Sequence, residues 1–119
     1  MKVRCVRLLD SLGKPTDRSH WAKVGAVYHV LSISIEPLQT RFRLVGEEPT
    51  PALFEPEMFE VVSAGIPSVW VVSSSRPGCL ALAPEAWSKP GFWESFFDGE
   101  PAAVACFEEY REKIVGADP

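Results

Sequence analysis

The chain lacks any long apolar run. Its 119 residues contain no stretch of about 18 uninterrupted apolar residues, the length that a membrane-spanning helix needs. Residues 1–7 (MKVRCVR) alternate basic and apolar side chains, whereas a secretory signal has a continuous apolar core. The sequence therefore predicts a cytoplasmic protein with no membrane partner.

Metal ligands are also scarce. The chain has three cysteines and two histidines, no Cys-x-x-Cys pair, and His20 and His29 lie far from any second pair of ligands. A structural zinc site needs four ligands in closely spaced pairs. We therefore expect no metal and no cofactor. We expect the cysteines to be free thiols that pack as small hydrophobes, with Cys79, after a Pro-Gly turn, the most exposed of the three.

Motifs of catalysis are missing too. No glycine-rich phosphate loop occurs, and the serines at 73–75 lack the Gly-x-Ser-x-Gly context of a hydrolase. Carboxylate pairs such as Glu47-Glu48 are not placed by any motif. These absences favour a non-enzymatic protein.

The composition is that of a folded domain with many short elements. Hydrophobic residues make up 46% of the chain and charged residues 24%, with four tryptophans and seven phenylalanines. A disordered chain would be poor in aromatic residues. Eleven prolines and eight glycines argue against a bundle of long helices. The length suits one domain.

Charge is unevenly distributed along the chain. Residues 1–45 carry eight Lys/Arg against three Asp/Glu, whereas residues 46–119 carry four against thirteen. If this asymmetry survives folding, one surface is acidic, repels nucleic acid and attracts a basic partner.

The sequence of the first half predicts closely spaced β-strands separated by turns. The later part of 24–35 alternates Leu31, Ile33 and Ile35 with Ser32 and Ser34, a period that is typical of a half-buried strand. Such spacing favours a small barrel. The five predicted strands are 2–10, 24–35, 39–45, 52–54 and 59–62.

The second half has a different pattern. Residues 68–74 and 79–83 predict a hairpin with a four-residue loop, and 101–115 predict a helix that begins at Pro101 and ends before Gly116. We expect an α+β fold: a five-stranded, barrel-like antiparallel sheet, extended by the hairpin, with one C-terminal helix. A single domain is predicted over 1–119, with a barrel-like part (1–62), a second part (68–119), and 63–67 as the only candidate boundary.

The aromatic segment 87–97 has two interpretations. In the first, it forms a satellite core that seats the helix. Alternatively, it is an exposed anchor for a partner, since aromatic residues dominate interface centres, and Glu94, Asp98 and Glu100 would then form its polar rim.

Two resemblances extend these expectations. Residues 21–31, with Arg41-Phe42-Arg43-Leu44, Leu53-Phe54 and 58–62, resemble a small Src-homology-like β-barrel module of bacteria and phages. The second half, from Leu80 through the aromatic segment to the final helix, resembles immunity proteins of polymorphic-toxin systems. That resemblance implies a non-enzymatic cytoplasmic protein that binds one cognate toxin.

We therefore expect a protein-binding module that neutralises a toxin by occluding its active site. Alternatives are a small nucleic-acid-binding barrel that uses the N-terminal basic residues, or a phage or bacterial accessory protein. Nucleic acid is the less favoured partner, because the whole chain is acidic. The candidate partner-binding residues are Trp93, Glu94, Asp98, Glu100, Glu108 and Glu112.

Overall fold

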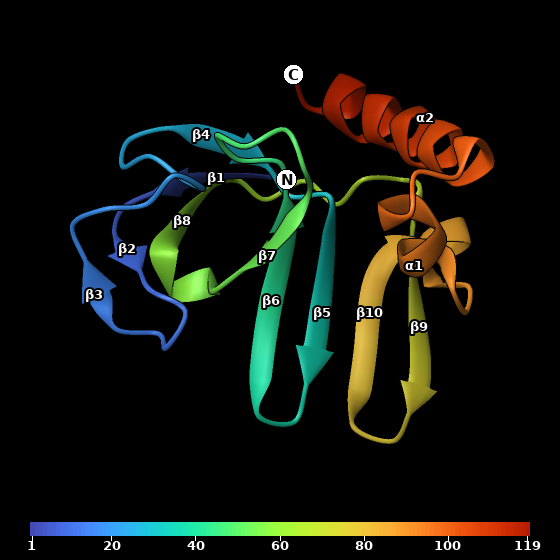
Figure 1. Ribbon diagram of the computed structural model, residues 1–119, viewed down its shortest axis with the longest axis horizontal. Helices are drawn as coiled ribbons and strands as arrows, with labels where there is room; N and C mark the ends of the chain where they lie inside the picture. The colour runs from blue at the N-terminus through green and yellow to red at the C-terminus, as the bar shows by residue number, and fades with distance from the viewer.

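The computed structural model describes residues 1–119 and has an α+β architecture (Figure 1). Three antiparallel sheets are followed by two α-helices. The strands are β1 (Lys2–Cys5), β2 (Leu8–Leu9), β3 (Pro15–Thr16), β4 (Val27–His29), β5 (Ser32–Glu36), β6 (Gln39–Leu44), β7 (Ala52–Phe54), β8 (Phe59–Ser63), β9 (Trp70–Arg76) and β10 (Cys79–Pro84). The helices are the short 3₁₀ helices η1 (Pro56–Met58) and η2 (Glu85–Ser88), and the α-helices α1 (Phe92–Phe97) and α2 (Pro101–Ala117).

The strands of the first half divide among three sheets. One sheet has the order β4-β1-β8, a second has five strands in the order β7-β6-β5-β10-β9, and β2 and β3 pair as a small third sheet. No sheet closes on itself, and the hairpin 70–84 supplies two strands of the five-stranded sheet. The five-stranded sheet is thus assembled from both halves of the chain, where we expected one from residues 1–62.

The predicted long strand 24–35 is interrupted at Val30 and Leu31. The backbone N–H of Val30 donates to the carbonyl oxygen of Met1 at 3.0 Å, whereas that of Leu31 donates to the carbonyl oxygen of Arg43 at 2.8 Å. Neighbouring residues therefore bond to different sheets, and the chain crosses between the sheets at this point. Both side chains are buried, which fixes the crossing in the core.

The hairpin of β9 and β10 has a tighter turn than expected. Only Pro77 and Gly78 separate the strands, where we expected a four-residue loop. Gly78 has a φ of 82°, a conformation that glycine adopts without steric cost. The turn therefore pairs β10 with β9, and the other edge of β10 pairs with β5, where Leu80 lies opposite Ile35.

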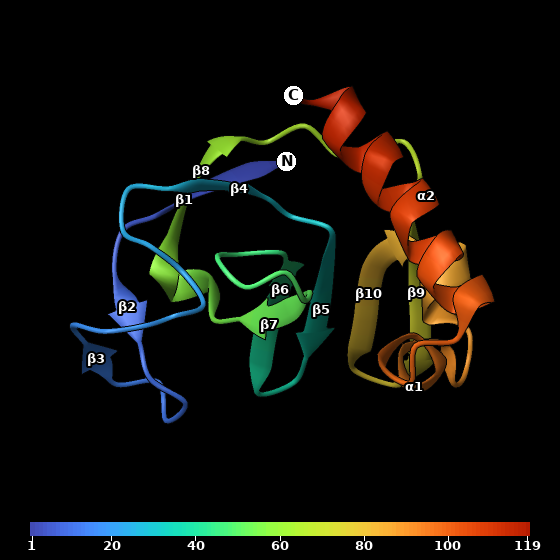
Figure 2. The same ribbon diagram turned by 45° about the horizontal axis from the view of Figure 1, so that its top comes forward.

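Helix α2 lies across the molecule, from α1 beside β9 and β10 toward the N-terminus (Figures 1 and 2). Pro101 occupies the start of the helix, as predicted, but the helix continues through Gly116 to Ala117. It buries Ala103, Phe107 and Ile114 along one side. No helix of the structure is both long and apolar enough to cross a lipid bilayer.

One cluster of fourteen buried hydrophobic residues joins the sheets and helices. Its members come from both sides of the segment 63–67, from Val3 of β1 to Ile114 of α2. Within it, the indole N–H of Trp70 donates to the carbonyl oxygen of Leu31 at 2.9 Å. The side chain of Trp70 therefore ties the second half to the point where the chain crosses between sheets.

Candidate functional site

The five-stranded sheet has one face of small and polar side chains. Ser32 of β5 lies opposite Arg43 of β6, and Ser34 lies opposite Ala81 of β10. Residues directly opposite in an antiparallel pair point to the same face. These side chains therefore share a face with one another, while Ile33 points to the other face, toward the core.

A groove of about 320 Å³ lies on this face, between the sheet and the segment 87–93. We call it the sheet groove. The small serine and alanine side chains leave this space open, because larger residues at the same positions would fill it. Its lining includes Ser32, Ser34, Arg43, Leu53, Leu80, Ala81, Trp87, Ser88, Lys89 and Trp93.

Arg43 is the principal charged group of the sheet groove. Its guanidinium carbon lies 3.7 Å from the centroid of the Trp93 ring, within the range of a cation–π contact. Desolvation alone lowers the pKa of Arg43 to about 10, and no carboxylate or hydrogen-bond acceptor of the chain offsets it. Sequence reasoning missed this site. The signal for it was the alternation of small polar residues along β5 beside an arginine on β6.

The aromatic segment packs mainly against α2. Trp87 is 2% exposed and stacks on Phe107 with ring centroids 5.1 Å apart. Trp93 contacts both rings and is half-buried. These contacts agree with the interpretation of this segment as a satellite core. Phe97, 54% exposed, is the aromatic side chain of this segment most open to a partner.

The five candidate carboxylates all lie on the exterior of α1, α2 and the turn between them. Only Glu108 has an ion-pair partner, the Arg111 guanidinium at 3.7 Å. Trp93, by contrast, is covered on one face by Arg43. The candidate partner-binding residues are thus divided: five carboxylates form an exterior acidic surface, and Trp93 belongs to the aromatic segment beneath it. The acidic surface is formed by Glu94, Asp98, Glu100, Glu108 and Glu112, all of them exposed.

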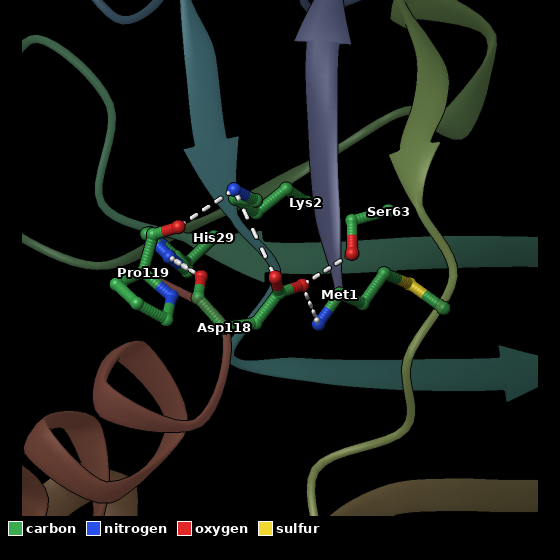
Figure 3. A network of polar contacts seen from close by, with 6 residues as sticks. All are labelled: Met1, Lys2, His29, Ser63, Asp118 and Pro119. Atoms are coloured by element: carbon green, nitrogen blue, oxygen red, sulfur yellow. Dashed lines mark hydrogen bonds and ion pairs between the residues drawn. The ribbon is translucent and has the colours of Figure 1, made fainter.

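The far end of α2 is held by polar contacts around Asp118 (Figure 3). Its carboxylate accepts a hydrogen bond from the Ser63 hydroxyl and lies 3.5 Å from the amino group of Met1. The Ser63 hydrogen bond is the main cause that lowers the pKa of Asp118, with Lys2 adding to it. Nε2 of His29 donates to the backbone oxygen of Asp118 at 2.7 Å. These contacts fix α2, and with it the acidic surface, to β1, β4 and β8.

The thiols are poorly suited to nucleophilic chemistry. All three are free, and burial raises the pKa of the Cys5 and Cys106 thiols, which disfavours the reactive thiolate. Cys79 is 7% exposed, and Nε of Arg76 donates to its sulfur at 3.1 Å. Our expectation that Cys79 is the most exposed thiol was wrong, because β10 pairs with β9 directly after the short turn. Cys106 is the more exposed.

The residues that could hold a metal do not gather in this fold. No group of three or more His, Cys, Asp or Glu side chains has the geometry of a metal site. The sheet groove and the acidic surface are the two candidate sites. Comparisons of the chain with protein-family models, with curated proteins and with solved structures gave no match.

Proposed function

We propose that the chain is a protein-binding module, and specifically an immunity protein that neutralises a cognate toxin in the cytoplasm by occluding its active site. The observation that carries the proposal is the acidic surface. Over α1, α2 and the turn between them, six carboxylates stand against two cationic side chains, Arg111 and Lys113. Four of the carboxylates, Glu94, Asp98, Glu100 and Glu112, have no ion-pair partner and are free to meet a basic partner.

The mechanism is electrostatic and steric. A toxin that cleaves nucleic acid carries a basic groove for its substrate, and a field of carboxylates attracts that groove. Such complementarity raises the association rate more than the affinity. The bound helices then exclude the substrate from the groove.

The basic residues of the first half give less support to a nucleic-acid partner. Arg4 pairs with Glu60 at 2.8 Å, and Arg41 pairs with Glu55 at 3.0 Å. Nucleic-acid binding needs free cationic groups that neutralise phosphates and thereby release the counterions of the nucleic acid, and these pairs occupy part of the basic set. The protein-partner proposal is therefore favoured over the nucleic-acid alternative.

We also propose that residues 1–62 form an open barrel of the Src-homology-like kind. Figure 2 supports this description, because β4, β1 and β8 curve around toward β7, β6 and β5 about a common interior. Val3, Tyr28, Leu44 and Phe54, from four of these strands, belong to the same buried cluster. The crossing at residues 30–31 links the two sides of this interior.

Growth rescue tests the proposed function. Cells that express a toxin domain encoded beside the gene for this chain are grown with and without the chain. The proposal predicts that the wild-type chain restores growth and that the variant Glu94→Lys/Asp98→Lys/Glu112→Lys restores less. A matched control, Asp17→Lys/Glu57→Lys/Glu48→Lys, makes the same change in net charge away from the acidic surface. Rescue by neither wild type nor control would contradict the proposal.

A further inference from the structure

The sheet groove contains a charged side chain, Arg43, that has no hydrogen-bond or ion-pair partner within the chain. The Arg43 guanidinium is half-buried, lies against the Trp93 ring, and forms no hydrogen bond or ion pair with any group of the chain. Two residues earlier on the same strand and the same face, Arg41 pairs with Glu55 at 3.0 Å. Apart from the cation–π contact with Trp93, the desolvated charge of Arg43 has no partner, and a buried charge without hydrogen bonds is unfavourable. The contrast between these two arginines therefore needs an explanation.

We propose that the sheet groove binds a small organic carboxylate with an apolar body, and that the Arg43 guanidinium holds its carboxylate group. This inference is independent of the acidic surface, apart from Trp93, which lies beneath both. The planar guanidinium presents its N–H groups as a fork that matches a carboxylate. The Trp93 ring contacts the guanidinium carbon but accepts none of its hydrogen bonds, so the N–H groups remain for the ligand.

The surroundings of Arg43 suit one end of such a ligand. Ser32 lies directly opposite Arg43 across the strand pair, and the groove lining adds Ser88 and Lys89. Hydroxyl and ammonium groups both donate hydrogen bonds to an anion. The carboxylate end of the ligand is therefore assigned to the part of the groove beside Arg43 and Ser32.

The other end of the groove has the opposite character. Glu36 lines the groove four residues along β5 from Ser32, which is about 14 Å at roughly 3.4 Å per residue. A carboxylate placed there would be repelled. Ala81 of β10, opposite Ser34, lies between the two ends, and Leu53 of β7 lies opposite Arg43 on the same face. The groove therefore fixes the direction of the ligand, with its apolar body on these two side chains.

The size of the groove points to a small ligand. Its volume of about 320 Å³ is at the lower limit of small-molecule sites, which span roughly 300–1,000 Å³. Half of its lining is apolar, whereas a site for inorganic phosphate needs only polar donors. An aromatic acid the size of benzoate fits both the space and the chemistry, and we use benzoate as the probe.

The test is a titration of the full chain followed by NMR of its backbone, indole and Arg Nε signals. Benzoate is expected to shift the signals of Arg43 and Trp93 with a Kd of about 1 mM, as the affinity per atom of small ligands implies. Arg43→Gln is expected to weaken binding by about tenfold or more, and Arg43→Lys nearly as much, because lysine keeps the charge but loses the fork. Arg41→Gln is the matched control and is expected to bind benzoate like wild type.

A second variant guards against a misfolded Arg43 mutant. Ala81→Leu keeps Arg43 and fills the part of the groove assigned to the apolar body, so it is expected to weaken benzoate binding while acetate, which lacks the body, is unaffected. Benzoate binding that is equal in wild type and in folded Arg43→Gln would overturn the proposal. Phosphate binding as tight as benzoate binding would overturn the assignment of an apolar carboxylate and indicate a general oxyanion site.

Discussion

At the scale of single residues, Tyr28 shows how burial and a neighbouring carboxylate act on one phenol. Its side chain is 8% exposed, its hydroxyl donates to Oε2 of Glu47 at 2.7 Å, and it accepts from the backbone N–H of Lys23 at 3.0 Å. Burial first, and then the hydrogen bond to Glu47, raise the pKa of Tyr28 to about 12. The folded state thus favours the protonated phenol.

The sign of the resulting pH dependence follows from this raised pKa. A group with a higher pKa in the folded state stabilises the fold fully below its unfolded pKa, near 10, and loses that contribution as pH rises toward 12. We predict that the free energy of unfolding of wild type falls across this window relative to Tyr28→Phe. Urea unfolding at several pH values measures it. If the two proteins kept a constant difference between pH 9 and 12, the account of Tyr28 would be wrong.

The two arginines of β6 are predicted to differ in their effect on stability. Arg43→Met removes a desolvated, unpaired charge and leaves an apolar side chain on Trp93, so the free energy of unfolding is expected to rise by about 1 kcal/mol. Arg41→Met breaks the ion pair with Glu55 and is expected to lower it by about 0.5–1 kcal/mol. Thermal or urea unfolding of both variants measures the difference. A larger loss from Arg43→Met than from Arg41→Met would show that Arg43 is a structural residue.

At the scale of elements, some ends of helices and strands follow from local sequence signals. Others depend on contacts with residues far away in the sequence. The helix 101–115 was predicted because Pro101 and the apolar spacing are local features, and α2 begins at that residue. The break in 24–35 was not predicted, because it depends on hydrogen bonds from Val30 and Leu31 to the distant carbonyls of Met1 and Arg43. Alternation of residue types identifies a strand but not the sheet to which it belongs.

Of the two candidate sites, the acidic surface could be predicted from the sequence, whereas the sheet groove could not. Exposure of Glu108 and Glu112 follows from their place on the polar side of an amphipathic helix. The surroundings of Arg43 do not follow from β6 alone, since they depend on Trp93 of α1 coming to lie on the sheet. From the sequence alone, a basic residue in a strand is predicted to face solvent, because the sequence does not show which other element packs over it.

The aromatic contacts of α2 yield a prediction at this scale. Phe107 is 1% exposed and lies against Trp87, Trp93 and Phe96. Phe107→Ala is expected to lower the free energy of unfolding by about 3–5 kcal/mol, as for other large buried aromatic side chains. Phe97→Ala, at a side chain 54% exposed, is the control and is expected to change it by less than about 1 kcal/mol. Equal effects would contradict the satellite-core interpretation.

At the scale of the whole molecule, the fold redistributes the charge asymmetry of the sequence. Basic residues of the first 45 positions pair with acids that follow them, as Arg4 does with Glu60. The carboxylates of α1 and α2 have few such partners, so the acidic character remains at that end of the molecule. The contacts of Asp118 with β1 and β8 (Figure 3) hold this surface in a fixed orientation.

The association rate with the toxin that we propose as the partner tests the central claim most directly. It is measured at low and high salt for wild type, for Glu94→Lys/Asp98→Lys, and for the control Asp17→Lys/Glu57→Lys. The account predicts that the first variant associates about tenfold more slowly at low salt, that the difference shrinks at about 0.5 M salt as the charges are screened, and that the control remains near wild type. Equal association rates for the two variants at low salt would contradict the claim that this surface guides the partner.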